Sequence, residues 1–314
     1  MNLVQKCVFL LPFLLFGISL SAQKDTIFDI SAIVELDSIT VTAKRDGFEV
    51  DDFIALVRND RSFYTAFRNL RTHAFYFNNE ISYFDKKGKP IASYKSKARQ
   101  NFENNYRTMD ILEETSSGKY FRKNDKYKFY TSRLYDRLFF TDGKVFESTQ
   151  EKEFNTEEGK KGMEGQVGEL KKLIFTPGEK ANVPFIGNKT AIFTEKMSKY
   201  YTYKISSEIY KNEIDAYVFT VELKDGYIFK NQGKTVIKYL RTYFDKSNFQ
   251  VLGRSYQLSS KGLLYQFDVR MEIRLEKIKD LYFPAFISYD GQWNIPAKKR
   301  EIAKFKAEFF NFNQ

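Results

Sequence analysis

The sequence predicts an α+β protein built around a large antiparallel sheet with one apolar face. Residues 263–277 alternate apolar and polar side chains along their whole length, which is the pattern of a strand with one buried face. Short turn-like sequences separate several similar stretches toward the C-terminus, and short turns join antiparallel neighbours. Tyr and Phe dominate an aromatic content of 17%, and aromatic residues favour strands.

Residues 1–22 have the pattern of a signal peptide. Lys6 precedes an apolar run that closes with small residues, and a cut after Ser21 or after Ala22 fits the pattern. The run is shorter than a membrane-spanning helix requires, and no second run approaches that length. We therefore expect an exported protein with no transmembrane segment in its mature chain.

Cleavage would remove Lys6 and Cys7, the only cysteine, so the formal net charge would fall from +11 to +10. A cationic chain favours anionic partners such as lipid head groups or polyanions. The alternative is a solvated surface with an excess of lysine. Without cysteine, the mature chain must take its stability from its core.

Residues 23–47 are expected to form an N-terminal leader or edge strand, and residues 48–314 a mainly antiparallel β domain. Apolar residues between Val50 and Leu70 recur at helical spacing, with a break at Asn59-Asp60. This spacing predicts two short helices.

Strand-like stretches follow at 74–84 and 91–97. Thr131 and Ser132 are expected to begin a short helix that continues through Leu138, and Ala191–Tyr201 is expected to form another. Residues 147–169 are charged and dotted with glycine, which indicates a linker or mobile loop.

The C-terminal part is predicted to form a meander of long strands. Their expected ranges are 203–211, 214–224, 234–245, 249–259, 263–277, 281–290 and 300–312. Turn-like pairs such as Asp225-Gly226, Lys279-Asp280 and Asp290-Gly291 separate them.

No catalytic residue, metal site or cofactor is predicted, and we do not expect an enzyme. His73 is the only histidine, so zinc and thiol chemistry have few ligands, and His73 is expected to be structural. Nucleophile-elbow, phosphate-loop and dinucleotide-binding motifs do not occur. The basic cluster 298–300 fits an anionic lipid or polymer better than nucleic acid in an exported protein, and a solvated strand face explains it with fewer assumptions.

Residues 234–312 resemble the late strands of the LolA-like half-barrel, the fold of periplasmic lipoprotein carriers and related lipid-binding envelope proteins. The stretches that carry the resemblance are 238–246, 250–254, 263–277 and Phe283-Pro284. The resemblance implies a curved antiparallel half-barrel whose concave face is covered by a few short helices, with Val50–Leu70 as a lid. It also implies a location in the periplasm or at the outer-membrane periphery of a Gram-negative cell.

On this interpretation, an apolar cavity binds a lipid or the acyl chains of a lipoprotein. Its expected lining is Phe267, Val269, Met271 and Ile273, with Trp293 at the mouth. The alternative is a structural or protein-interaction envelope protein whose core is filled by its own side chains and binds no ligand. In that case the partner is another envelope protein, and Trp293 is a core anchor.

Overall fold

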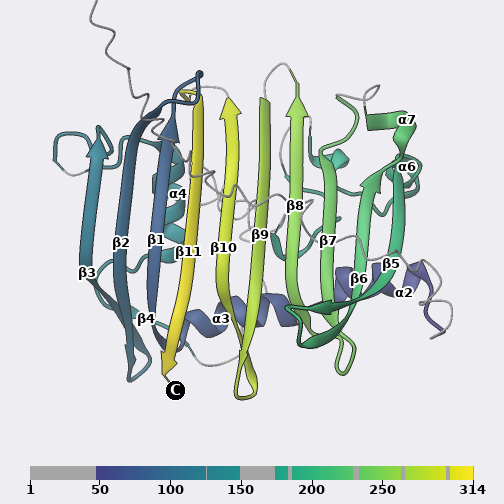
Figure 1. Cartoon of the computed structure of the whole chain (residues 1–314), viewed down its shortest axis with the longest axis horizontal. Coiled ribbons are helices and arrows are strands. Elements are labelled where there is room, and N and C mark those ends of the chain that lie inside the picture. The colour runs from purple at the N-terminus through teal and green to yellow at the C-terminus, as the bar shows by residue number, and fades with distance from the viewer. Residues whose placement is uncertain are drawn as a thin grey trace, which may run out of the picture. The chain divides into compact units, whose positions relative to one another are not determined.

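Eleven strands form one open antiparallel sheet in the part of the chain that the structure describes (Figure 1). The computed structural model describes residues 47–124, 126–148, 174–182, 186–228, 233–262, 266–294 and 298–313. All described residues belong to one compact unit. The predicted signal peptide and leader, and nearly all of the predicted linker 147–169, lie outside the described residues.

The strands form two meanders. The first contains β1 (Ala74–Phe84), β2 (Pro90–Glu103), β3 (Tyr106–Gly118) and β4 (Val145–Phe146). The second contains β5 (Tyr201–Tyr210), β6 (Ile214–Leu223), β7 (Ile237–Asp245), β8 (Val251–Lys261), β9 (Gln266–Ile278), β10 (Leu281–Asn294) and β11 (Glu301–Asn313).

The first and last long strands join these meanders in the middle of the sheet. The order is β4-β3-β2-β1-β11-β10-β9-β8-β7-β6-β5, and β1 pairs with β11 so that Phe77 faces Phe309 and Ile81 faces Phe305. Every neighbouring pair is antiparallel. The predicted α+β class with a large antiparallel sheet is therefore confirmed.

The main helices lie behind the sheet in the view of Figure 1. They are α2 (Val50–Asn59), α3 (Ser62–Arg71) and α4 (Tyr130–Phe139). The short elements α6 (Glu195–Ser198) and α7 (Asp225–Ile228) lie nearer the β5 edge, and a further short element is η2 (Gly187–Lys189). The predicted break at Asn59-Asp60 is confirmed, because α2 ends at Asn59 and α3 begins at Ser62. No described helix is long and apolar enough to cross a membrane.

The two faces of the sheet differ in chemistry. On β1, the odd-numbered residues from Phe75 to Tyr83 are buried, and the alternate residues are half-buried or exposed. We call the buried side, on which α3 and α4 contact β10 and β11, the covered face. The other side, the open face, carries ion pairs such as Lys95–Glu80 at 3.0 Å and Lys304–Asp290 at 2.8 Å. This arrangement is typical of a one-sided antiparallel sheet.

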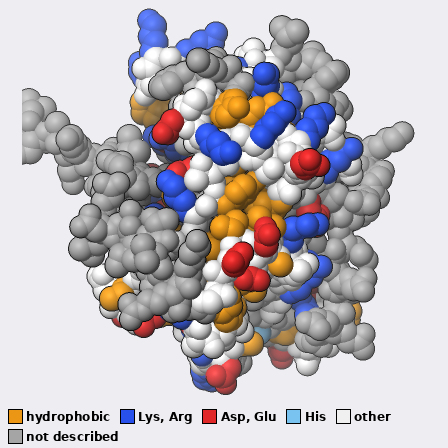
Figure 2. All heavy atoms as spheres, turned by 90° about the vertical axis from the view of Figure 1, so that its right-hand side faces the viewer, with side chains coloured by type: hydrophobic (Ala, Val, Ile, Leu, Met, Phe, Trp, Pro, Cys, Tyr) orange, Lys and Arg blue, Asp and Glu red, His pale blue; other side chains and the backbone are white. Residues whose placement is uncertain are grey.

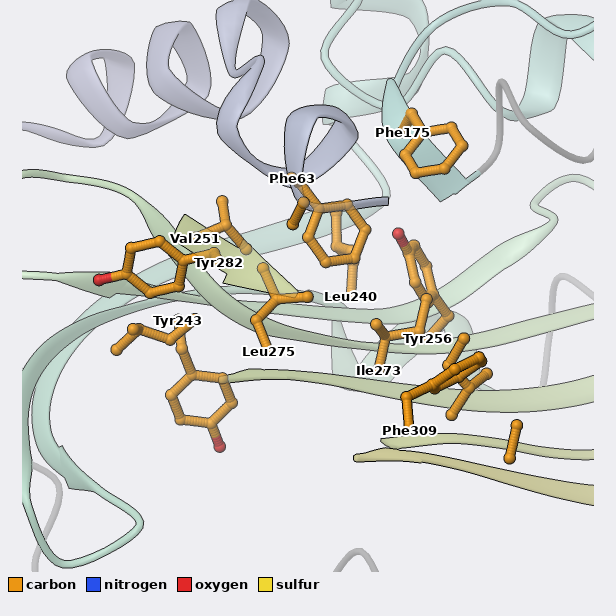
Figure 3. Packing of buried hydrophobic residues seen from close by; sticks show 14 of the residues in the cluster. Phe63, Phe175, Leu240, Tyr243, Val251, Tyr256, Ile273, Leu275, Tyr282 and Phe309 are labelled. Atoms are coloured by element: carbon orange, nitrogen blue, oxygen red, sulfur yellow. The ribbon is translucent and has the colours of Figure 1, made fainter. Parts of the chain in front are cut away.

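The centre of the covered face is a continuous aromatic and aliphatic core. In Figure 3, Phe63 of α3 and Phe175 lie over Leu240 and Tyr256, whereas Tyr243 points to the other side of the sheet. Phe63, Leu240 and Tyr256 are at most 3% exposed. The predicted lid segment therefore fills the lower part of the covered face in Figure 1, where α2 and α3 cross the strands.

Two helix predictions need correction. α4 begins at Tyr130, with Phe129 as its N-cap residue, so Thr131 and Ser132 lie inside the helix and are buried. The predicted helix over Ala191–Tyr201 is only the single turn α6. Tyr201 instead begins β5, where it pairs with Leu223, because strand pairing outweighs the weak local helical preference.

The predicted turn at Asp290-Gly291 is wrong. β10 continues through these residues to Asn294, and Gly291 pairs with Ala303 and Val269. A side chain at Gly291 would start 2.3 Å from the Tyr289 hydroxyl, so the glycine makes room for the tyrosine that leans along the same strand. Asp290 instead pairs with Lys304 on the open face.

Candidate ligand-binding surface

The burial of β9 side chains on the covered face decreases toward the upper end of the sheet, as drawn in Figure 1. Leu275 and Ile273 are 2% and 1% exposed. Met271, Val269 and Phe267, which follow upward on the same face, are each only half-buried. The helix layer therefore seals the lower part of β9 and leaves its upper part accessible.

On each side one half-buried side chain continues this region, Trp293 on β10 and Leu258 on β8, whereas Gly291 and Ser260 are buried. Phe267 faces Trp293 of β10 and Ser260 of β8, and Val269 faces Gly291 and Leu258. We call the half-buried side chains Phe267, Val269, Met271 and Trp293 the apolar strip. Met271 packs against the main buried cluster, and among the described residues the other three lie beyond it.

Trp293 is fixed against the start of α4. Its indole Nε1 donates a hydrogen bond to Thr131 Oγ1 at 3.0 Å, and its ring meets Tyr130 edge-on at 5.5 Å. The indole is half-buried, so it is anchored at one edge and accessible at another. This geometry agrees with both interpretations of Trp293, as a core anchor and as a residue at the mouth of a ligand site.

Glu301 holds the first turn of α4 in place. Its carboxylate accepts hydrogen bonds from Tyr130 N at 2.6 Å, Thr131 N at 2.9 Å and Thr131 Oγ1 at 2.8 Å. A carboxylate at a helix N-terminus also suits the helix dipole. One strand residue thus positions the tyrosine and threonine that hold Trp293.

A cationic group borders the apolar strip at this point. Lys298 Nζ lies 4.6 Å from the centre of the Tyr130 ring. Burial raises the pKa of the Tyr130 hydroxyl, and Glu301 adds to this rise, while Arg133 and Arg137 oppose it. The Tyr130 hydroxyl is therefore neutral at physiological pH and adds no negative charge beside Lys298.

The structure brings together four of the five residues that the sequence indicates as a cavity lining. Phe267, Val269, Met271 and Trp293 share the apolar strip, whereas Ile273 lies in the buried cluster at its lower boundary. The sequence indicated Lys298 as part of the basic cluster 298–300 but did not place it near the strip, and it gave no sign of Leu258 of β8 or Tyr130 of α4. Only the strand register and the packing of α4 reveal them.

His73 has a structural environment. Its Nδ1 lies 2.9 Å from Asn69 O and 3.1 Å from Thr72 Oγ1, and its ring meets Phe283 edge-on at 5.1 Å. Among the described residues, no three metal-ligating side chains gather as a group.

Comparison with known proteins gives only distant similarities. No protein-family model matches the chain, and no curated protein matches it. A DUF1329 family protein from Desulfovibrio piger is 11% identical, with 86% of this chain and 92% of that chain covered and a TM-score of 0.24. A candidate outer membrane lipoprotein-sorting protein domain from Vibrio parahaemolyticus is 6% identical, with 84% of this chain and 93% of that chain covered and a TM-score of 0.28.

Lipovitellin, in a structure that concerns lipid–protein interactions, is 8% identical, with 77% of this chain and 25% of that chain covered and a TM-score of 0.25. These TM-scores are too low for any of the three structures to support a function or a family. The function must be argued from the chain's own residues.

Proposed function

We propose that this protein is an exported cell-envelope protein that binds the apolar part of an amphiphile, such as a lipid or a lipoprotein acyl chain, on the apolar strip. The observation that carries the proposal is the fall in burial along β9. Three successive inward-facing side chains, Met271, Val269 and Phe267, are only half-buried on the face that elsewhere forms the core. Apolar side chains that remain accessible beside a core favour an apolar ligand.

The surroundings of the strip suit an amphiphile with an anionic end. Lys298 lies beside Tyr130 at the strip's border, and the chain as a whole has a formal net charge of +11. A bound acyl chain would gain about 0.8 kcal/mol for each buried methylene group. An acidic head group could meet the lysine while the chain covers the strip.

The alternative is a structural or protein-interaction envelope protein with a filled core. The specific observation in its favour is the lower part of the covered face, where Ile273, Leu275 and Phe283 are at most 2% exposed. The two functions differ in what covers Phe267 and Val269. If an acyl chain covers these two residues, the protein binds a ligand, and if another protein covers them, it is an interaction module.

Lipid extraction from the purified full-length protein, combined with displacement of a fluorescent fatty acid, tests the proposal. We expect wild-type protein to carry extractable lipid and to bind the probe. Phe267→Glu places a charge in the strip and should weaken probe binding at least about tenfold.

Ile91→Glu is the matched control, because Ile91 is an apolar residue that is 43% exposed on β2, outside the strip. This variant should bind the probe like wild type, and circular dichroism should show both variants folded. A folded wild-type protein that carries no lipid and ignores the probe overturns the proposal and favours the interaction module.

A further inference from the structure

A second site of different chemistry lies near the β5 edge of the sheet. It is an open pocket of about 680 Å³, and its described lining comes from residues 180–182, 187–189, 196–200 and 233–234. Its polar lining consists of Lys180, Lys189, Lys196, Lys234, Asn182 and Asn188. Figure 2 views this side of the molecule and shows lysine and arginine side chains gathered over its upper half.

The pocket has a strongly positive lining. Among the described residues that line it, four are lysines and none is a carboxylate. Glu179 and Glu195 adjoin two of these lysines in sequence but do not line the pocket. No ion pair joins any of the four ammonium groups to a residue that the structure describes. Like charges held together without counterions repel one another, and an anionic ligand would relieve that repulsion.

One further lysine, Lys238, lies near Lys189 of the pocket lining. Lys238 Nζ is held by Thr235, whose carbonyl and hydroxyl oxygens each accept a hydrogen bond at 2.8 Å. Burial lowers the pKa of the Lys238 ammonium, Asp268 raises it, and the positive charges of Lys189 and Lys261 lower it. Lys189, which lines the pocket, is therefore close enough to Lys238 for their charges to interact.

The wall of the pocket is tied together by a buried threonine. Thr190, 1% exposed, accepts a hydrogen bond from Ala181 N at 3.0 Å, and its hydroxyl lies 2.7 Å from the carbonyl oxygens of Glu179 and Gly187. A side chain at Gly187 would start 2.0 Å from Ala181 O, so these two segments are in direct contact. The segments that carry Lys180 and Lys189 are thus tied to each other, and a site that is held in place binds with less loss of entropy.

We propose that this pocket binds a phosphate group. Lysine ammonium groups are compact point charges with three donors each, which suits phosphate oxygens, and the Asn188 amide can add a neutral donor. The phosphate can belong to a lipid head group or to a soluble phosphate compound. This inference does not depend on ligand binding at the apolar strip.

Two probes distinguish these sources in the full-length protein. Calorimetry with inorganic phosphate measures a soluble anion, and co-sedimentation with vesicles of phosphatidylcholine and phosphatidylglycerol measures a lipid head group. The pocket variant is Lys189→Gln with Lys234→Gln. The control is Lys86→Gln with Lys87→Gln, which removes the same charge from the exposed turn between β1 and β2.

We expect wild type and the control to bind at least one probe, and the pocket variant to bind it about tenfold more weakly. Binding of vesicles but not of phosphate identifies a lipid head group, and binding of phosphate that displaces vesicles identifies a general phosphate site. Equal weakening in both variants shows a non-specific charge effect and overturns the proposal. Failure of wild type to bind either probe also overturns it, whatever the fatty-acid result at the apolar strip.

Discussion

Arg254 of β8 and Asp60, between α2 and α3, form an ion pair inside the core, with Nη2 3.8 Å from Oδ2. The two side chains are 0% and 6% exposed. The guanidinium also donates to Thr242 Oγ1 at 3.1 Å and to Ile174 O at 3.0 Å, and it lies 4.5 Å from the centre of the Phe63 ring. Asp60 accepts hydrogen bonds from Ser62 N and Phe63 N, so the pair connects the sheet to the first turn of α3.

Removing one partner of this pair should strongly destabilise the fold. We expect Arg254→Leu to lower the free energy of unfolding by about 3–5 kcal/mol, because it leaves the buried Asp60 carboxylate without its cation. Urea denaturation measures the change. Arg270→Leu, at an exposed arginine on β9, is the control and should change stability by no more than about 0.5 kcal/mol. Similar small effects at both positions would contradict a stabilising role for the pair.

The carboxylate of Glu301 should stabilise α4. Glu301→Gln removes the charge that two backbone amides of the first turn share, and we expect a loss of about 1–3 kcal/mol. Hydrogen exchange at the Tyr130 and Thr131 amides should accelerate, since their acceptor weakens. Glu308→Gln, at an exposed site on the same strand, should leave both amides unchanged. Unaltered exchange in the Glu301 variant would show that α4 does not need this cap.

Gly253 should not tolerate a side chain. A Cβ atom there would lie 2.7 Å from the Tyr210 hydroxyl, and that hydroxyl donates to Leu252 O at 3.1 Å. Gly253→Ala should therefore displace Tyr210 and cost about 1–3 kcal/mol in thermal unfolding. Gly226→Ala, where a side chain meets open space, is the control and should not lower the melting temperature. A Gly253 variant as stable as wild type would mean that Tyr210 moves freely.

The protein should lose stability at alkaline pH. Burial raises the pKa of Tyr120, Tyr203 and Tyr256 to about 12, from the usual value of 10.0. An unfolded chain releases these protons near pH 10, so stability is fully present below pH 10 and falls as the pH rises toward 12. Tyrosinate absorbance and circular dichroism, followed together, measure ionisation and unfolding. Complete tyrosine ionisation near pH 10 in a folded protein would contradict this burial.

The strands of the second meander could be predicted because two signals indicate the same strand boundaries. These signals are the alternation of apolar and polar residues and the turn-like sequences between the strands. The predicted strand 263–277 corresponds to β9 at Gln266–Ile278, and the predicted strand 300–312 to β11 at Glu301–Asn313. The turn predicted at Asp290-Gly291 was wrong because a glycine can either form a turn or make room for a neighbouring side chain. Only the position of Tyr289 distinguishes these roles.

The contacts that build the candidate sites connect residues far apart in the chain. Glu301 caps a helix 170 positions earlier, and the lysines of the phosphate pocket come from three separate segments. No local spacing indicates such pairs. Alternation does place Phe267, Val269 and Met271 on one face, but it does not show that α2 and α3 seal only the lower end of that face.

The most direct test of the central claim is the affinity of the full-length protein for a series of saturated fatty acids of increasing chain length. If acyl chains bury their methylene groups on the apolar strip, each added methylene should tighten binding by about 0.8 kcal/mol, or about fourfold, until the strip is filled. Phe267→Glu should flatten that dependence, and Ile91→Glu should preserve it. No binding, or an affinity that does not change with chain length in the folded wild-type protein, would contradict the claim.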